Sequence, residues 1–173
     1  ARTLGIDTRA LYQSLSAASI RAAIKEQELG SICDHLRKIA PDLRGQYTTA
    51  FDEVEYRRYW DIKMRGLHAW QTALALETMN RTGRDGLTLA DIGDSSGNHG
   101  VFIKALAPAG RIARMVSVNL DPVAVEKVRA KGGEAVLCRA EALDLAGIQA
   151  DLFLSFETIE HLTDPVRFLH ALA

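Results

Sequence analysis

The sequence predicts an α/β protein with a doubly wound, mostly parallel sheet in its second half and a helical region before it. Two observations predict this class. From residue 87 onward, short apolar runs alternate with segments of helical periodicity, which is typical of parallel strands joined by crossover helices. Before residue 85, apolar residues instead recur every three or four positions, as they do along amphipathic helices. We therefore expect a helical cap over residues 1–84 and a sheet domain over residues 85–173.

Three helices are expected in the cap. Their apolar stripes are Leu11, Leu15, Ala18 and Ala22 in the first, Ile32, Leu36 and Ile39 in the second, and Val54, Ile62, Leu67, Trp70 and Leu74 in the third. Gly30 and Pro41 end the first two helices. The third runs from about residue 51 to residue 79, and Gly66 is a candidate position for a kink in it.

Four strands are expected in the sheet domain, joined by helices. The strands are the apolar runs at residues 87–91, 111–118, 134–137 and 151–156. Helical segments follow at residues 101–106, at residues 123–131 and after Pro165, and a polar loop at residues 139–143 leads into a further short helix. Pro122 and Pro165 each stand at the start of an expected helix, where proline is favoured.

A turn of small residues after the first strand carries the clearest functional signal. Asp91 ends the strand, and the turn that follows contains Gly93 and Gly97. Such a turn lets a ligand approach the backbone closely and points N–H groups at it, while Asp91 would face the ligand's cationic part. The alternative is an ordinary connection between a strand and a helix, because an isolated glycine-rich turn is a weak signal.

Three further stretches at the expected carboxyl ends of the strands make the pattern specific. They are Val116–Pro122, Arg139–Leu143 and Asp151–Pro165. Together with Asp91–Gly97 they resemble, in order and spacing, four motifs of the class I S-adenosylmethionine (AdoMet)-dependent methyltransferases, a family with a Rossmann-like sheet. The resemblance extends from Leu87 to Leu172. It implies an enzyme that transfers a methyl group from AdoMet to a small molecule, such as a sugar or a secondary metabolite.

The motifs also imply a cofactor site. By this resemblance, AdoMet is bound by Asp91, Gly93, Asp94, Ser95, Gly97, Asn119, Leu120, Ala140, Glu141 and Phe156. In the family, N-terminal helices cover the cofactor and shape the acceptor pocket. The alternative for this chain is that the helices of residues 1–84 only cover one face of the sheet.

Three positions depart from the family's pattern. Ser95 replaces the second glycine of the first motif, Asn119 replaces the acid that holds the ribose, and Arg139 replaces the acid that faces the adenine. A hydrogen bond to a neutral acceptor is worth ~1 kcal/mol less than one to a charged acceptor, so the change at Asn119 alone would weaken cofactor binding about tenfold. These departures leave open a second function, a non-catalytic methyltransferase-like domain with a degenerate cofactor site. A nicotinamide-dependent oxidoreductase is disfavoured, because its fingerprint needs glycine at Ser95 and Asn98.

The residues directly after the fourth strand are the candidates for chemistry. Glu157, Glu160 and His161 would share one face if a helical turn began at Glu157. In some relatives a Glu-x-x-Glu-His segment supplies metal ligands, and in others the Glu and His line the acceptor pocket. We favour the second role and expect no metal, with Glu160 and His161 as catalytic residues. His161 is the candidate general base because imidazole titrates near neutral pH.

Composition sets the remaining expectations. The formal net charge is −1, and 47% of the 173 residues are hydrophobic, so nothing in the charge recruits nucleic acid. No apolar run is long enough to span a bilayer, and Cys33 and Cys138 are expected to be reduced thiols of a cytoplasmic protein. The expected partner is a small-molecule methyl acceptor, and a homo-oligomer is compatible with the sequence. A complete family member has seven strands, so we expect a C-terminally truncated fragment.

Overall fold

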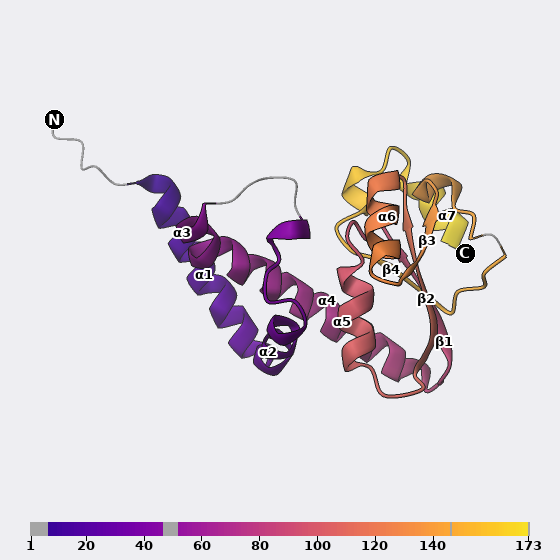
Figure 1. The fold of residues 1–173 in the computed structure, drawn as a ribbon, viewed down its shortest axis with the longest axis horizontal. Helices are drawn as coiled ribbons and strands as arrows, with labels where there is room; N and C mark the ends of the chain where they lie inside the picture. Colours follow the sequence, from indigo (N-terminus) through magenta and orange to yellow (C-terminus); the bar gives the residue numbers. More distant parts are fainter. Residues whose placement is uncertain (1–6, 47–51, 146, 173) are drawn as a thin grey trace. The chain divides into compact units, whose positions relative to one another are not determined.

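The computed structural model describes residues 7–46, 52–145 and 147–172 (Figure 1). The contacts between residues divide the chain into two compact units, Ala1–Ala73 and Leu74–Ala173. The division falls inside helix α4 (Asp61–Thr82), so the last residues of that helix belong with the sheet. The predicted boundary at residue 84 stays a prediction about the domains of the whole protein.

The first unit is helical, as predicted. It contains α1 (Thr8–Glu26), α2 (Gly30–Ile39), a 3-10 turn (Arg44–Gln46), a short α3 (Glu53–Glu55), a π-helical turn (Tyr56–Trp60) and the start of α4. Asp7 begins α1 by accepting a hydrogen bond from the Ala10 N–H. Helix α4 continues through Gly66. A Cβ atom at Gly66 would lie 2.9 Å from Cγ2 of Ile20, so the glycine permits the close approach of α1.

The buried face of α1 differs from the predicted apolar stripe. Leu11 and Leu15 are 50% and 64% exposed, whereas Gln13 and Ala17 are buried. Gln13 is buried because both ends of its amide are bonded: Nε2 donates to Glu55 Oε1 at 2.6 Å, and Oε1 accepts from Arg58 at 2.6 Å. A hydrogen-bonded polar network therefore takes the place that periodicity alone assigned to leucine.

The second unit is built on a four-stranded, all-parallel sheet. Its strands are β1 (Leu87–Ile92), β2 (Ile112–Asn119), β3 (Glu134–Leu137) and β4 (Leu152–Ser155), in the order β3-β2-β1-β4. The register pairs Ile92 with both Val118 and Ser155, so the carboxyl ends of β1, β2 and β4 meet at one edge of the sheet. The predicted α/β class is confirmed, and the predicted strand bounds differ from these by one residue at most.

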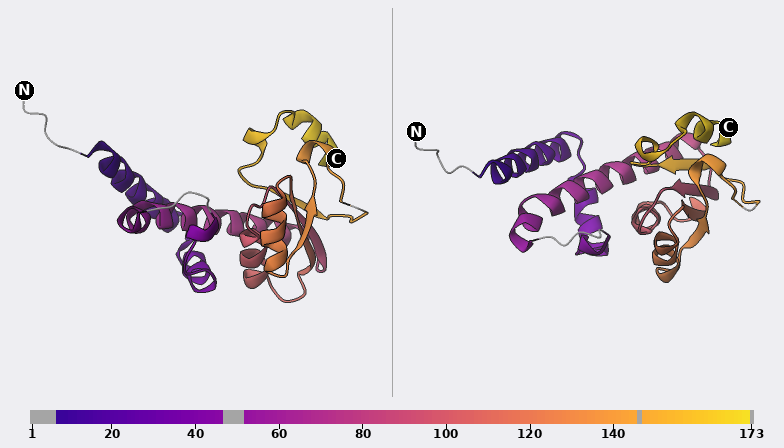
Figure 2. Two further views of the ribbon diagram at one scale, coloured as in Figure 1. Left: turned by 45° about the horizontal axis from the view of Figure 1, so that its top comes forward. Right: turned by 90° about the horizontal axis from the view of Figure 1, so that it is seen from above.

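Helices α5 (Asn98–Leu106), α6 (Pro122–Ala130) and α7 (Pro165–Leu172) cover the sheet on both faces. Figure 2 shows α7 on the opposite side of the sheet from α5 and α6. Because side chains alternate along a strand, β1 contributes to two apolar clusters. Leu87 and Leu89 pack with Met79, Ile103 and Met115, and Ala90 and Ile92 pack with Val116, Val118 and Phe168.

This alternation sets the direction of the acid near the end of β1. Asp91 is two residues beyond Leu89, so its side chain lies on the face that α5 covers. Among the residues that the structure describes, no helix combines the length and apolar character needed to cross a membrane. Cys33 and Cys138 are both free thiols, one in each unit.

Candidate functional site

The turn between β1 and α5 lies at the carboxyl edge of the sheet, and its shape depends on two glycines. Gly93 has φ +95° and Gly97 has φ +75°, both in the left-handed region that disfavours other residues. A Cβ atom at Gly93 would collide with Oγ1 of Thr158, from the loop after β4. Thr158 donates a hydrogen bond from Oγ1 to the Ile92 carbonyl at 2.9 Å. The loop after β4 therefore packs directly on the turn after β1, at Gly93.

Asp94 closes this turn with its own carboxylate. It is 3% exposed, and its Oδ1 accepts from the N–H groups of Ser96 at 3.2 Å and Gly97 at 3.0 Å. Ser117 on β2 lies 3.4 Å from the other oxygen. Burial and the neighbouring Asp91 raise the pKa of Asp94. The N–H groups of Ser96 and Gly97 are thus bonded within the turn itself.

Asp91 forms a buried pair with His99, the second residue of α5. Asp91 is 0% exposed, and its Oδ2 accepts from His99 Nδ1 at 3.0 Å. Its other oxygen, Oδ1, is buried and has no hydrogen-bond partner among the described residues. Burial opposes charge on His99, but Asp91 and Asp94 together raise the pKa of the imidazole to about 9. His99 is therefore an imidazolium at neutral pH.

His99 received no role from the sequence, although a signal was present. It follows the turn directly, and a side chain in the first turn of that helix lies close to the end of the preceding strand. Its ring also packs edge-on against Phe156, with centroids 5.3 Å apart. Thr158 was missed as well, because nothing in the sequence separates it from an ordinary loop threonine.

Asn119 is held by two hydrogen bonds at the end of β2. Its Nδ2 donates to the Asp94 carbonyl at 3.2 Å, and its Oδ1 accepts from the Asp121 N–H at 2.9 Å. Asp121 is engaged too, since its carboxylate caps α6 by accepting from the Val123 N–H. Leu120 between them is exposed. The amide of Asn119 keeps a second N–H and a second lone pair for a ligand.

The loop after β3 is tied to the segment after β4. Ala140 and Glu141 lie in a buried 3-10 turn (Ala140–Ala142). Oε1 of Glu141 accepts from the N–H and the hydroxyl of Thr163, at 3.1 and 3.0 Å. Oε2 of Glu141 is buried without a hydrogen-bond partner. Arg139 is exposed, 3.7 Å from Glu141.

The segment after β4 does not begin as the sequence predicted. Glu157 has φ +54°, outside the helical region, and the only turn is a 3-10 turn at Ile159–His161. The expected shared face of Glu157, Glu160 and His161 is therefore wrong, because a left-handed residue interrupts the helical path. All three side chains are exposed. Phe156, before them, is half-buried and contacts His99.

Spacing suited to a metal ion occurs once among the described residues. The ligand atoms of Asp91, Asp94 and His99 lie within 4.8 Å of one another. His99 Nδ1 also lies 3.0 Å from Asp91 Oδ2, the distance of a hydrogen-bonded ion pair. We interpret the three residues as an ion-pair cluster. Glu157, Glu160 and His161 form no such group in the described part of the chain.

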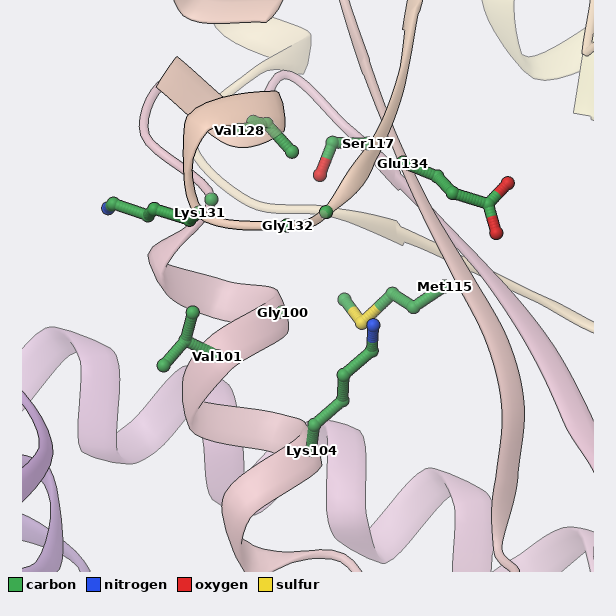
Figure 3. Close-up of a pocket in the computed structure, with 11 residues that line it drawn as sticks. Gly100, Val101, Lys104, Met115, Ser117, Val128, Lys131, Gly132 and Glu134 are labelled. Carbon is green, nitrogen blue, oxygen red and sulfur yellow. The ribbon is translucent and has the colours of Figure 1, made fainter. Parts of the chain in front are cut away.

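A cavity of about 90 Å³ lies beside the turn, between α5, the end of α6 and strands β2 and β3 (Figure 3). Gly97, Ser117 and Lys131 are among its lining residues. Ligand sites are usually cavities of roughly 300–1,000 Å³, so we assign no cofactor to this one. Of the predicted cofactor residues, only Gly97 lines it.

Solved structures with the same arrangement of elements are methyltransferases. One is the sugar N-methyltransferase KedS8 from Streptoalloteichus sp. ATCC 53650, with 17% identity and a TM-score of 0.52 over 73% of this chain and 49% of that chain. Another is the plantazolicin methyltransferase BpumL in complex with SAH, with 15% identity and a TM-score of 0.54 over 89% of this chain and 56% of that chain. The fold is thus that of a class I methyltransferase.

The chain spans about half the length of these two proteins. Residues 92–173 match the methyltransferase domain family, a match that covers the first-motif turn and everything after it. This match and the shared fold support the resemblance of residues 92–173 to the class I AdoMet-dependent methyltransferases that the motifs predicted. A search of curated protein sequences finds no match.

Proposed function

We propose that this protein transfers the methyl group of AdoMet to a small molecule, such as a sugar or a secondary metabolite. The observation that carries the proposal is the unpaired oxygen of Asp91. It is a fully buried carboxylate oxygen without a hydrogen-bond partner, and leaving such an acceptor unsatisfied costs roughly 1–3 kcal/mol. The methionine ammonium of AdoMet is a donor of the right charge, so the cluster fits the cofactor.

The other predicted residues fit the same ligand less strongly. Gly93 and Gly97 keep side chains away from the turn. Asn119 would bond a ribose hydroxyl with its remaining N–H or lone pair, and the buried turn at Ala140 and Glu141 would lie beside the adenine. Bound AdoMet supplies a methyl group already activated by its sulfonium.

The acceptor side of the reaction is assigned to the segment after β4. Parallel sheets bind ligands at the carboxyl ends of their strands, and Glu160 and His161 follow that end of β4. In this role His161 takes a proton from the acceptor, and Glu160 orients the imidazole or the acceptor. We further propose that the protein works in the cytoplasm and that residues 1–84 act as its cap domain. A sugar acceptor is in keeping with the name of one of the two similar structures, a sugar N-methyltransferase.

A second function is supported by one observation. Asn119 donates a hydrogen bond to the Asp94 carbonyl, and the Asp94 carboxylate accepts one from the Gly97 N–H. These bonds hold the shape of the loop without a ligand. A non-catalytic domain that binds a different ligand or a protein partner would show this arrangement.

Calorimetry with S-adenosylhomocysteine (SAH), the product of AdoMet, separates the two functions. We expect micromolar binding by the parent protein and a loss of about tenfold or more in Asp91→Asn, because the ammonium loses a charged acceptor. Asp85→Asn is the matched control, since Asp85 is an exposed acid just before β1. Absence of SAH binding to the parent would favour the non-catalytic domain.

A further inference from the structure

We propose that His99 is a positioning residue that holds the Asp91 carboxylate by one oxygen and sets a positive charge beside the buried acids, so that the other oxygen of Asp91 can receive the ammonium group of the cofactor. This inference rests on the proposed function, because it assigns Asp91 to the methionine end of AdoMet. It adds His99, from α5, which would act on the cofactor through the side chain of Asp91.

The two carboxylates need a cation. Asp91 is 0% and Asp94 is 3% exposed, and oxygen atoms of the two lie within 4.8 Å of each other. Two like charges at this distance, shielded from water, repel each other. Burial and the neighbouring Asp91 raise the pKa of Asp94, and a cation beside the pair opposes this rise.

His99 supplies that cation from the helix that begins after the turn. Its side chain is 13% exposed, and the bond from Nδ1 to Asp91 Oδ2 is 3.0 Å long. The edge of Phe156 packs on the ring and limits its movement. The raised pKa of His99, about 9, agrees with an imidazolium held between the two acids.

Lys131 and Ser117 also interact with Asp94. Lys131, at the end of α6, donates from Nζ to the Ser96 carbonyl at 2.6 Å and to Asn98 Oδ1 at 2.7 Å, so it braces the same turn. Lys131 is attracted to Asp94 but bonds neither carboxylate in the interactions described. Ser117 on β2 is neutral and donates weakly to Asp94 at 3.4 Å. His99 is thus the cation in direct contact with Asp91.

The bond geometry leaves one place for the cofactor. His99 occupies Oδ2 of Asp91, whereas Oδ1 is buried without a partner. An ammonium group bonded to Oδ1 would therefore complete the carboxylate without displacing His99. The histidine thus fixes which oxygen of Asp91 is used.

The test compares SAH with 5′-methylthioadenosine, which has the same adenosine and thioether but no amino acid end. Affinities are measured for both ligands by calorimetry at several pH values from 5.5 to 7.5. In His99→Gln, we expect SAH affinity to fall about tenfold at pH 6 and to recover as the pH rises, because without the imidazolium the pKa of Asp94 is raised further, until that acid ionises at higher pH. Methylthioadenosine affinity should change little. His170→Gln, an exposed histidine on α7, is the matched control and should behave as the parent.

A second variant checks the mechanism and guards against misfolding. Asp94→Asn keeps an oxygen for the N–H groups of Ser96 and Gly97 but removes one charge, so His99→Gln/Asp94→Asn should lose the pH dependence of SAH binding. Circular dichroism establishes that each variant is folded. If His99→Gln shifts both ligands equally at every pH, or if the double variant keeps the slope, His99 is not a positioning residue. If the parent binds neither ligand, the proposed function itself fails.

Discussion

The loops after β1 and β4 lie side by side at the carboxyl edge of the sheet but are built in different ways. The first is buried, and its acids are bonded to backbone N–H groups and to His99. The second ends in the exposed residues Glu157, Glu160 and His161. A site for a constant ligand benefits from groups fixed in advance. The buried loop after β1 would therefore suit a cofactor that is always the same, and the exposed residues after β4 would suit an acceptor that varies between enzymes.

The largest expected effect comes from breaking the junction between the two loops. Gly93→Val should abolish SAH binding and lower the free energy of unfolding, because a side chain there collides with Thr158 and strains a residue at φ +95°. Calorimetry and urea unfolding measure the two effects. Gly110→Val is the control: it has φ +80° but nothing within 4 Å of its Cβ atom. If the two variants lose SAH affinity and stability equally, backbone strain alone explains the losses, and the contact between Gly93 and Thr158 has no special role.

The second prediction concerns the exposed loop. If His161 is the general base, His161→Ala should lower turnover by ~10²–10⁴ and leave SAH affinity nearly unchanged. Steady-state kinetics on the full-length protein with an identified acceptor measures the first effect, and calorimetry measures the second. His170→Ala is the control, and a chelator should leave the parent's activity intact. A fully active His161→Ala variant would show that this loop carries no proton transfer.

The two loops also differ in how far the sequence could predict them. The four strands, their bounds and the turn at Gly93 follow from periodicity and glycine placement, which are local properties. The pairing of Asp91 with His99 depends on how α5 sits on the strand, and no local pattern in the sequence predicts the left-handed backbone of Glu157. In α1 the same limit appears, because the bonds of Gln13 reach residues more than forty positions away. Long-range polar partners are invisible to a pattern of apolar residues.

The third prediction tests the buried loop through pH. The pKa of His99 is raised from 6.5 to about 9 in the folded protein. Its contribution to stability is therefore full below about pH 6.5 and is lost as the pH rises toward 9. The free energy of urea unfolding should fall over this range in the parent but much less in His99→Gln. Equal slopes in the two proteins would mean that His99 is not charged in the fold.

The smallest expected effect is at Asn119, where the sequence departs from the ribose-binding acid of the family. Asn119→Asp would offer the ribose a charged acceptor, which should tighten SAH binding by a factor of several. The gain is limited, because an aspartate cannot donate to the Asp94 carbonyl as Nδ2 of Asn119 does. Asp121→Asn is the control, since that side chain caps α6. Calorimetry that shows equal or weaker binding in Asn119→Asp would mean that the bond to Asp94, and not the ribose, explains the asparagine.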